Sequence, residues 1–185
     1  VLNINYRSSE AIVEFARSIG YPQNLLAHFP NTSLFALNAF PNQTQYPNHL
    51  PWSDQLATLL SPADSVAALV HDDEISSQGN HYEARLIAGM VWMLRQTMSS
   101  ELDGQNAVNH RPPTPEEFWE DCVGVVTPHR AQRALVVKEL EILFPTEKNL
   151  IDGAIDTVER FQGGERHCVI VTYGVADVDV ITGEE

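Results

Sequence analysis

Apolar and polar residues alternate in blocks along the chain, and these blocks predict a succession of strands and helices. Val123 to Val126 and Cys168 to Tyr173 are short runs rich in β-branched residues, as is typical of strands covered on both faces. The run from Ser65 to His71 has the same character and is predicted to be another strand. Short strands are also expected over residues 1–5 and just before Thr157.

Helical periodicity lies between these runs. The most regular helix is predicted to start at Asn80, because Asn80 and Glu83 have the spacing of a capping box and apolar residues then recur every three or four positions. Thr127 followed by Pro128 predicts a second helix start, with a hydroxyl cap and a proline at the first helical position. A third helix is expected after Ser8. The predicted buried residues are Ala84, Ile87, Ala88, Val91 and Leu94 of the first helix, and Leu135, Val136, Leu140 and Leu143 of the second. In the third helix, Ile12, Phe15, Ala16 and Ile19 fall on one face.

The alternation of strand and helix indicates the α/β class. Strands joined through helices form right-handed crossovers, so we expect a mostly parallel sheet with helices on both faces, in three layers. Residues 1–185 are interpreted as one domain. Residues 22–62 are rich in proline and aromatic residues, which predicts an irregular insertion with one short helix at 54–60.

The composition narrows the classes of protein. The formal charge is -14 with only 11 Lys and Arg, which opposes broad electrostatic wrapping of nucleic acid, so any such contact must be local. The two cysteines have no metal-site spacing, which favours an intracellular location, either cytoplasmic or nuclear. No apolar run approaches the roughly 20 residues that span a bilayer, so no membrane contact is expected. The chain opens without Met inside a predicted strand, which suggests a fragment of a longer protein.

Candidate chemistry lies where strands end, since ligands of open α/β sheets gather at the carboxyl edge. Tyr6 offers an aromatic ring that could stack on a base, and Arg7 offers a guanidinium that could bind a phosphate. Alternatively, they are a core tyrosine beside a solvated arginine. Thr127 and the helix after it offer an anion site, or an ordinary cap. The stretch from Gln162 to Glu165 offers a glycine turn and a carboxylate for ribose hydroxyls, or is only a turn.

Two rival functions remain open from the residues. Asp72 and Asp73 follow the predicted strand at 65–71 and could bind Mg²⁺ in a receiver-like or nuclease domain, or form a solvated acidic turn. Alternatively, the aromatic residues of 22–62 dock a partner of a non-catalytic scaffold, or form the small core of the insertion itself.

Four segments in this order resemble a known family: "NYRSSEAI", "NHYEARLI", "VGVVTPHRAQ" and "DTVERFQGGERHCVIV". They are similar to the second, C-terminal RecA-like domain of superfamily 1 helicases, in the branch of the nonsense-mediated-decay RNA helicase and its DNA-acting relatives. The resemblance extends from Leu2 to about Tyr173 and implies a P-loop NTPase-type fold.

The resemblance implies a role for each matching residue. Tyr6 would stack near the adenine of ATP, Arg7 would act catalytically on the γ-phosphate, and Glu165 would hold the ribose. Gln162 would help to sense the nucleotide, beside Gly164. Thr127 and Thr157 would contact single-stranded DNA or RNA, with Arg130 and Gln132 as further members of that surface.

One sequence motif that an ATP-driven helicase requires is not found in this chain. The chain contains no GxxxxGK[ST] phosphate loop. The resemblance therefore implies that ATP and Mg²⁺ are held mainly by a first RecA-like domain of the same protein, and that this chain alone does not hydrolyse ATP. The arginine motif that the family places after the last strand is not found either. Both features would also fit a degenerate scaffold.

Overall fold

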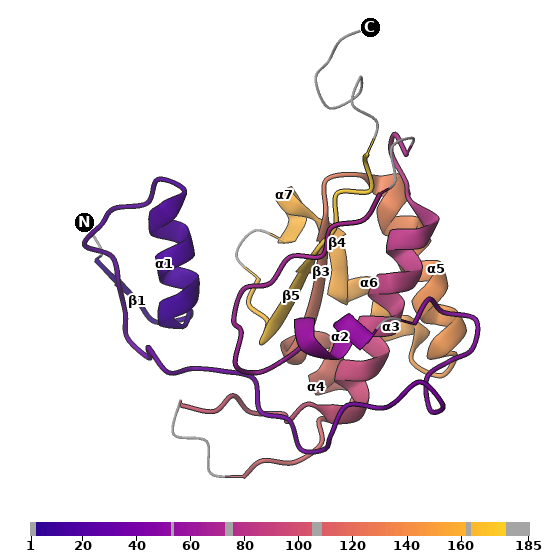
Figure 1. Ribbon diagram of the computed structural model, residues 1–185, viewed down its shortest axis with the longest axis horizontal. Helices are drawn as coiled ribbons and strands as arrows, with labels where there is room; N and C mark the ends of the chain where they lie inside the picture. Colours follow the sequence, from indigo (N-terminus) through magenta and orange to yellow (C-terminus); the bar gives the residue numbers. More distant parts are fainter. Residues whose placement is uncertain (1–2, 53, 73–75, 105–108, 162–163, 177–185) are drawn as a thin grey trace, which may run out of the picture.

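The computed structural model describes residues 3–52, 54–72, 76–104, 109–161 and 164–176 of the chain. A three-stranded parallel sheet forms the centre of the larger part, and a two-stranded parallel sheet lies near the N-terminus (Figure 1). The predicted α/β class with parallel strands is confirmed. The strands are β1 (Ile4–Asn5), β2 (Leu26–Ala27), β3 (Val123–Thr127), β4 (Ile155–Thr157) and β5 (Cys168–Val171). The helices are α1 (Glu10–Ser18), α2 (Asp54–Leu59), α3 (His81–Thr97), α4 (Pro115–Glu117), the π-helical turn η1 (Phe118–Cys122), α5 (Arg130–Leu143), α6 (Lys148–Ala154) and α7 (Val158–Phe161).

Strand β3 is the centre of the larger sheet, whose order is β4-β3-β5. All of its residues are buried, as its continuous apolar sequence predicts. Thr127 of β3 pairs with Thr157 of β4, and Val126 of β3 pairs with Val171 of β5. Because all three strands are parallel, their carboxyl ends meet at one edge of the sheet.

Helices lie on both faces of this sheet (Figure 1). On one face, α5 and α6 pack against Val123 and Val125, which belong to the main hydrophobic core. On the other face, α7 covers Gly124, where an added Cβ would lie 2.6 Å from the Phe161 ring. The absence of a side chain at Gly124 therefore lets the aromatic ring lie directly on the strand. Val169 and Val171 of β5, on this second face, are exposed.

Helix α3 is the most deeply buried helix and packs beside α5 (Figure 1). The Asn80 side chain accepts a hydrogen bond from the Glu83 N–H at 2.9 Å, so the predicted start of this helix is confirmed. The second half of the predicted capping box is wrong. The Asn80 N–H donates to Gln132 of α5 instead, and Glu83 is directed toward the end of β5.

The N-terminal part consists of β1, α1 and β2. Helix α1 begins after Ser9, one residue later than the predicted cap at Ser8. The face that carries Ile12, Phe15 and Ile19 is exposed, with Phe15 at 50%, whereas Val13 is 1% exposed. Helix α1 lies apart from the larger sheet and contacts β2 (Figure 1). An amphipathic pattern states which face is apolar, not what covers it.

Two other predicted elements differ from the structure. The run at 65–71 is not a strand: residues 63–70 are exposed and none joins the order β4-β3-β5. An apolar run becomes a strand only where a neighbouring strand accepts its backbone hydrogen bonds. The helix predicted to start at Thr127 begins at Arg130, with His129 as its N-cap. Thr127 instead ends β3, because its backbone is in register with Thr157.

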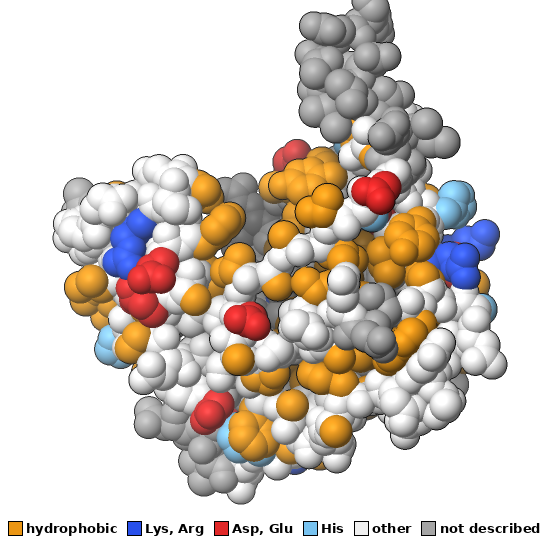
Figure 2. Space-filling view, viewed as in Figure 1, with side chains coloured by type: hydrophobic (Ala, Val, Ile, Leu, Met, Phe, Trp, Pro, Cys, Tyr) orange, Lys and Arg blue, Asp and Glu red, His pale blue; other side chains and the backbone are white. Residues whose placement is uncertain are grey.

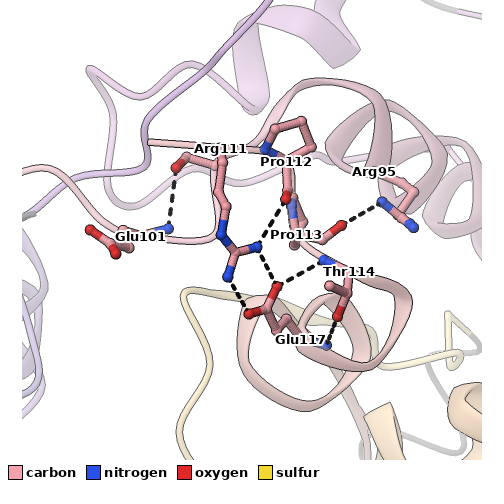
Figure 3. Close-up of polar contacts among 8 residues, drawn as sticks. Arg95, Glu101, Arg111, Pro112, Pro113, Thr114 and Glu117 are labelled. Atoms are coloured by element: carbon pink, nitrogen blue, oxygen red, sulfur yellow. Dashed lines mark hydrogen bonds and ion pairs between the residues drawn. The ribbon is translucent and has the colours of Figure 1, made fainter. Parts of the chain in front are cut away.

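A polar cluster closes the connection between α3 and β3 (Figure 3). Arg111 donates two hydrogen bonds to the Glu117 carboxylate, at 2.7 and 2.5 Å. Glu117 also completes a capping box with Thr114 at the start of α4. Arg95 of α3 donates to the Pro113 carbonyl at 3.3 Å. These contacts hold the entry to η1, where Phe118 and Trp119 are buried.

Two helical glycines are expected to respond oppositely to alanine. At Gly89 of α3 an added Cβ would lie 1.6 Å from the Tyr46 hydroxyl oxygen, so Gly89→Ala must displace a buried ring, and we expect the free energy of unfolding to fall by about 1–3 kcal/mol. At Gly153 of α6 nothing lies within 4 Å, and Gly153→Ala is expected to raise it by about 0.5–1 kcal/mol. Urea denaturation measures both values, and changes of the same sign would contradict this packing.

The Arg111–Glu117 contact predicts a pH-dependent stability. The hydrogen bonds from Arg111, and then that from the Thr114 backbone, lower the pKa of Glu117 from 4.5 to about 2. A carboxyl with a lowered folded-state pKa stabilises the fold above pH 4.5, and this contribution disappears as the pH falls toward 2. Glu117→Gln keeps the capping box and removes the charge. We expect the Tm difference between wild type and Glu117→Gln to be constant at neutral pH and to vanish between pH 4.5 and 2; a constant difference throughout would contradict it.

Candidate functional site

Arg7 and Glu165 come together from the two ends of the described chain. Arg7 follows β1, and Glu165 lies in the turn before β5. Arg7 Nε and Glu165 Oε1 form an ion pair, and both side chains are more than half exposed. Exposed ion pairs contribute at most about 1 kcal/mol, so a ligand can replace either partner at little cost. The contact therefore places a cation and a carboxylate side by side on an accessible surface.

The backbone before Arg7 is held by a side chain. Asn5 Oδ1 accepts hydrogen bonds from the N–H groups of Arg7 at 2.8 Å and Ser8 at 3.0 Å. This asparagine turn redirects the chain from β1 into α1. Tyr6 points outward from the turn, and its ring lies 4.4 Å from that of His28 at the end of β2. The turn thus presents an exposed aromatic ring next to the exposed guanidinium of Arg7.

The glycine turn is tied to the chain itself. The Gly164 N–H donates to the Phe161 carbonyl at 2.9 Å, and an added Cβ would lie 3.0 Å from that oxygen. A close backbone approach does occur at this turn, and it is to α7. Gln162 and Gly163 lie outside the described residues. The adjacent Arg166 places its guanidinium carbon 5.5 Å from the centre of the Phe161 ring.

The predicted nucleic-acid residues lie at the carboxyl edge of the larger sheet. Thr127 and Thr157 are neighbours in register, and both are buried. Thr127 Oγ1 accepts a hydrogen bond from the His129 N–H at 3.3 Å, which shapes the entry into α5. Arg130 is exposed at the first position of that helix. The structure therefore brings three of the four residues together, with only the arginine exposed.

Gln132, the fourth residue, is fully buried in a polar network. Its Oε1 accepts from the Asn80 N–H at 2.7 Å, and its Nε2 donates to Thr172 Oγ1 at 3.2 Å. Thr172 in turn donates to Glu83 Oε2, which also accepts from the Gly174 N–H at 3.1 Å. Here Gln132 connects α3, α5 and the end of β5. The network occupies both polar groups of its amide, so the predicted contact with nucleic acid would require the network to open.

Sequence reasoning missed Glu83, His71 and Gly174. His71 Nε2 lies 2.9 Å from Glu83 Oε1, so the carboxylate ties α3 both to the 66–72 stretch and to the segment after β5. Gly174 has φ 65° and lies so close to Gln132 that an added Cβ would be 2.8 Å from its Cγ. The only sequence signal was the capping-box spacing, which assigned Glu83 to a different partner.

Charge at the surface is predominantly acidic, and basic side chains do not form a broad patch on the face shown in Figure 2. They appear there only toward its two sides, whereas apolar side chains are spread across its middle. Among the described residues, no cluster of three His, Cys, Asp or Glu side chains could hold a metal ion. Asp72 is exposed, while Asp73 lies outside the described part. No helix in that part is long and apolar enough to cross a membrane.

The fold and the arrangement of the site define an α/β domain of the RecA-like, P-loop NTPase type. The chain belongs to the AAA domain family, whose pattern matches residues 1–177. This domain is found in superfamily 1 helicases, so the chain is a helicase-type, NTPase-like domain. No curated protein and no solved structure matches the chain.

The buried amide of Gln132 predicts a measurable loss of stability. Gln132→Met keeps the length of the side chain but leaves the Asn80 N–H and the Thr172 hydroxyl without this partner, and we expect the free energy of unfolding to fall by about 1–3 kcal/mol. Lys138→Met, at an exposed position of α5, is the control and is expected to change it by less than about 0.5 kcal/mol. Equal effects in thermal or urea unfolding would contradict the network.

Proposed function

We propose that the chain is the C-terminal motor domain of an ATP-dependent superfamily 1 helicase. The single observation that carries the proposal is the contact of Arg7 with Glu165, because it joins two separate motif segments at one accessible place. Membership of the AAA domain family supports the same class. In this proposal a first RecA-like domain of the same protein holds most of the ATP and Mg²⁺, and this chain closes over the nucleotide.

Each side chain at the contact has chemistry that suits part of ATP. The Arg7 guanidinium offers several N–H donors for the γ-phosphate, where a cation stabilises the charge of the transferring phosphoryl group. The Glu165 carboxylate accepts hydrogen bonds from ribose hydroxyls, and the Tyr6 ring stacks on the base. Arg7 exchanges Glu165 for phosphate when the nucleotide binds. Gln162 and Gly164 line the same turn in the proposal, with Gln162 reporting the nucleotide state.

Single-stranded nucleic acid is assigned to the carboxyl edge of the larger sheet. Arg130 contacts the phosphate backbone directly, while Thr127 and Thr157 shape the backbone beneath it. Gln132 holds this edge through its contacts with Asn80 and Thr172. A motor that repeatedly grips and releases a strand needs few such contacts, which is compatible with the acidic charge. DNA is favoured over RNA and 5′ to 3′ movement over the reverse, in an intracellular protein.

A non-catalytic scaffold is the second candidate function. Its support is the extended 22–62 segment, whose aromatic side chains lie partly at the surface. The receiver-like or nuclease alternative requires a carboxylate at the end of a strand, and Asp72 does not follow a strand in this structure. Asp72→Ala is silent in a motor or a scaffold, and disabling in a metal-dependent nuclease.

Hydrolysis of ATP separates the motor from the scaffold. In the complete protein, Arg7→Ala is expected to lower kcat about 10³-fold, since a cation at the γ-phosphate acts in the transition state. Arg160→Ala removes an arginine of similar exposure next to Asp156 and is expected to leave kcat within about twofold. Turnover is measured by phosphate release with saturating ATP and single-stranded DNA.

The isolated 185-residue chain is the second arm of this experiment. It carries one wall of the nucleotide cleft in this proposal, so we expect negligible turnover and weak binding. Robust hydrolysis by the chain alone would overturn the assignment of the nucleotide to two domains. Hydrolysis by the complete protein that does not change in Arg7→Ala would overturn the motor role of the contact.

A further inference from the structure

Two aromatic rings project side by side from the ends of β1 and β2. The register pairs Asn5 with Ala27, so the following residues, Tyr6 and His28, leave the small sheet as neighbours. The His28 N–H donates to the Asn5 carbonyl at 2.7 Å, which extends the pairing to the base of both rings. The ring centroids are 4.4 Å apart with an interplanar angle of 40°. Two strands therefore hold the two rings in a fixed relation.

The Phe29 ring packs against the His28 ring of this pair. Phe29 is half-buried, and its ring lies 4.5 Å from that of His28 in an edge-on arrangement. Tyr6 remains 59% exposed, and His28 is also exposed. The rings are thus ordered by one another and by the strand ends, while part of their surface remains open to a flat ligand.

The rings adjoin the contact that joins the first and the last of the four motif segments. Arg7 follows Tyr6 directly in the chain and is paired with Glu165. A ring surface, a guanidinium and a carboxylate therefore follow one another over a short distance. Each of the three groups suits one part of a nucleotide: the ring suits the base, the guanidinium the phosphates and the carboxylate the ribose.

We propose that His28 and Tyr6 together form the base-binding shelf of the nucleotide site, in which His28 holds the Tyr6 ring and widens the surface that stacks on a purine. The inference rests on the proposed function, because it names the ligand part that this surface takes. It adds a residue from the proline-rich segment, which no motif identifies. Stacking accepts any base with a flat face, so the shelf provides affinity for nucleobases with little discrimination among them.

The test is ligand binding to the isolated chain, which is monitored by the amide NMR signals. The ligands are ADP, ribose 5-phosphate and inorganic pyrophosphate, each at millimolar concentration. ADP is expected to shift the signals of Tyr6, His28 and Glu165, whereas pyrophosphate shifts Arg7 without His28. Tyr6→Ala is expected to weaken ADP binding about tenfold and His28→Ala about threefold to tenfold. Neither variant changes the binding of pyrophosphate or ribose 5-phosphate by more than about twofold.

Two further variants control for structural damage. His28→Phe keeps an aromatic ring and is expected to bind ADP as wild type does. Tyr21→Ala removes a tyrosine of the same N-terminal part that is also 59% exposed, and it is expected to leave ADP binding unchanged. Unfolding of the N-terminal part would instead weaken all three probes together, and would also remove the His28→Phe rescue.

The outcomes separate the inference from the proposed function. ADP that binds no more tightly than pyrophosphate, or that binds equally to wild type and His28→Ala while shifting Glu165, overturns the shelf and leaves the proposed function intact. ADP that shifts neither Tyr6 nor Glu165, together with pyrophosphate that does not shift Arg7, overturns both. Loss of binding in Tyr21→Ala as well as in His28→Ala overturns the shelf, because the effect would not be specific to the paired rings.

Discussion

The complete burial of β3 is the constraint on which the larger part of the molecule depends. A strand without exposed residues must have both edges paired and both faces covered. Its edges are paired by β4 and β5, α5 and α6 cover one face, and the Phe161 ring covers the other at Gly124. Because every pairing is parallel, Thr127, Thr157 and Thr172 are brought to the same end of the sheet.

Burial at that end requires polar partners. The Thr172 hydroxyl and the N–H groups of Asn80 and Gly174 are all near the end of the core, where an unsatisfied donor costs about 1–3 kcal/mol. Gln132 and Glu83 supply the acceptors, and in doing so they fasten α3 and α5 to the segment that follows β5. The same contacts that stabilise the fold thus determine the shape of the edge beside Arg130.

How much the sequence predicts depends on whether a signal is local. Asn80 and the periodic apolar residues after it predict α3 well, and the β-branched runs predict β3 and β5. These signals succeed because a helix cap and a continuous apolar run are formed by residues that are adjacent in the sequence. The strand predicted at 65–71 is wrong, because strand formation depends on a neighbouring strand that the local pattern does not specify. The exposure of the apolar face of α1 depends in the same way on which elements lie beside it. The partners of Glu83 fail for the same reason, since Thr172 and Gly174 are distant in sequence. For the site, the resemblance identified Arg7 and Glu165 as members of one site, but no pattern identified His28, whose place depends on the register of β1 and β2.

The two polar centres of the molecule differ in exposure, and exposure suits them to different tasks. Glu83 and Gln132 are in low-dielectric surroundings, where breaking a hydrogen bond is costly, so they hold one geometry. Arg7 and Glu165 are solvated, where an ion pair is weak and its partners exchange readily. In the function that we propose, the contact with the nucleotide forms and dissolves in every cycle, so a strong buried pair would oppose it. The weak pair at the surface, held in place by the Asn5 turn on one side and by α7 on the other, combines a fixed location with partners that a phosphate and a ribose can replace.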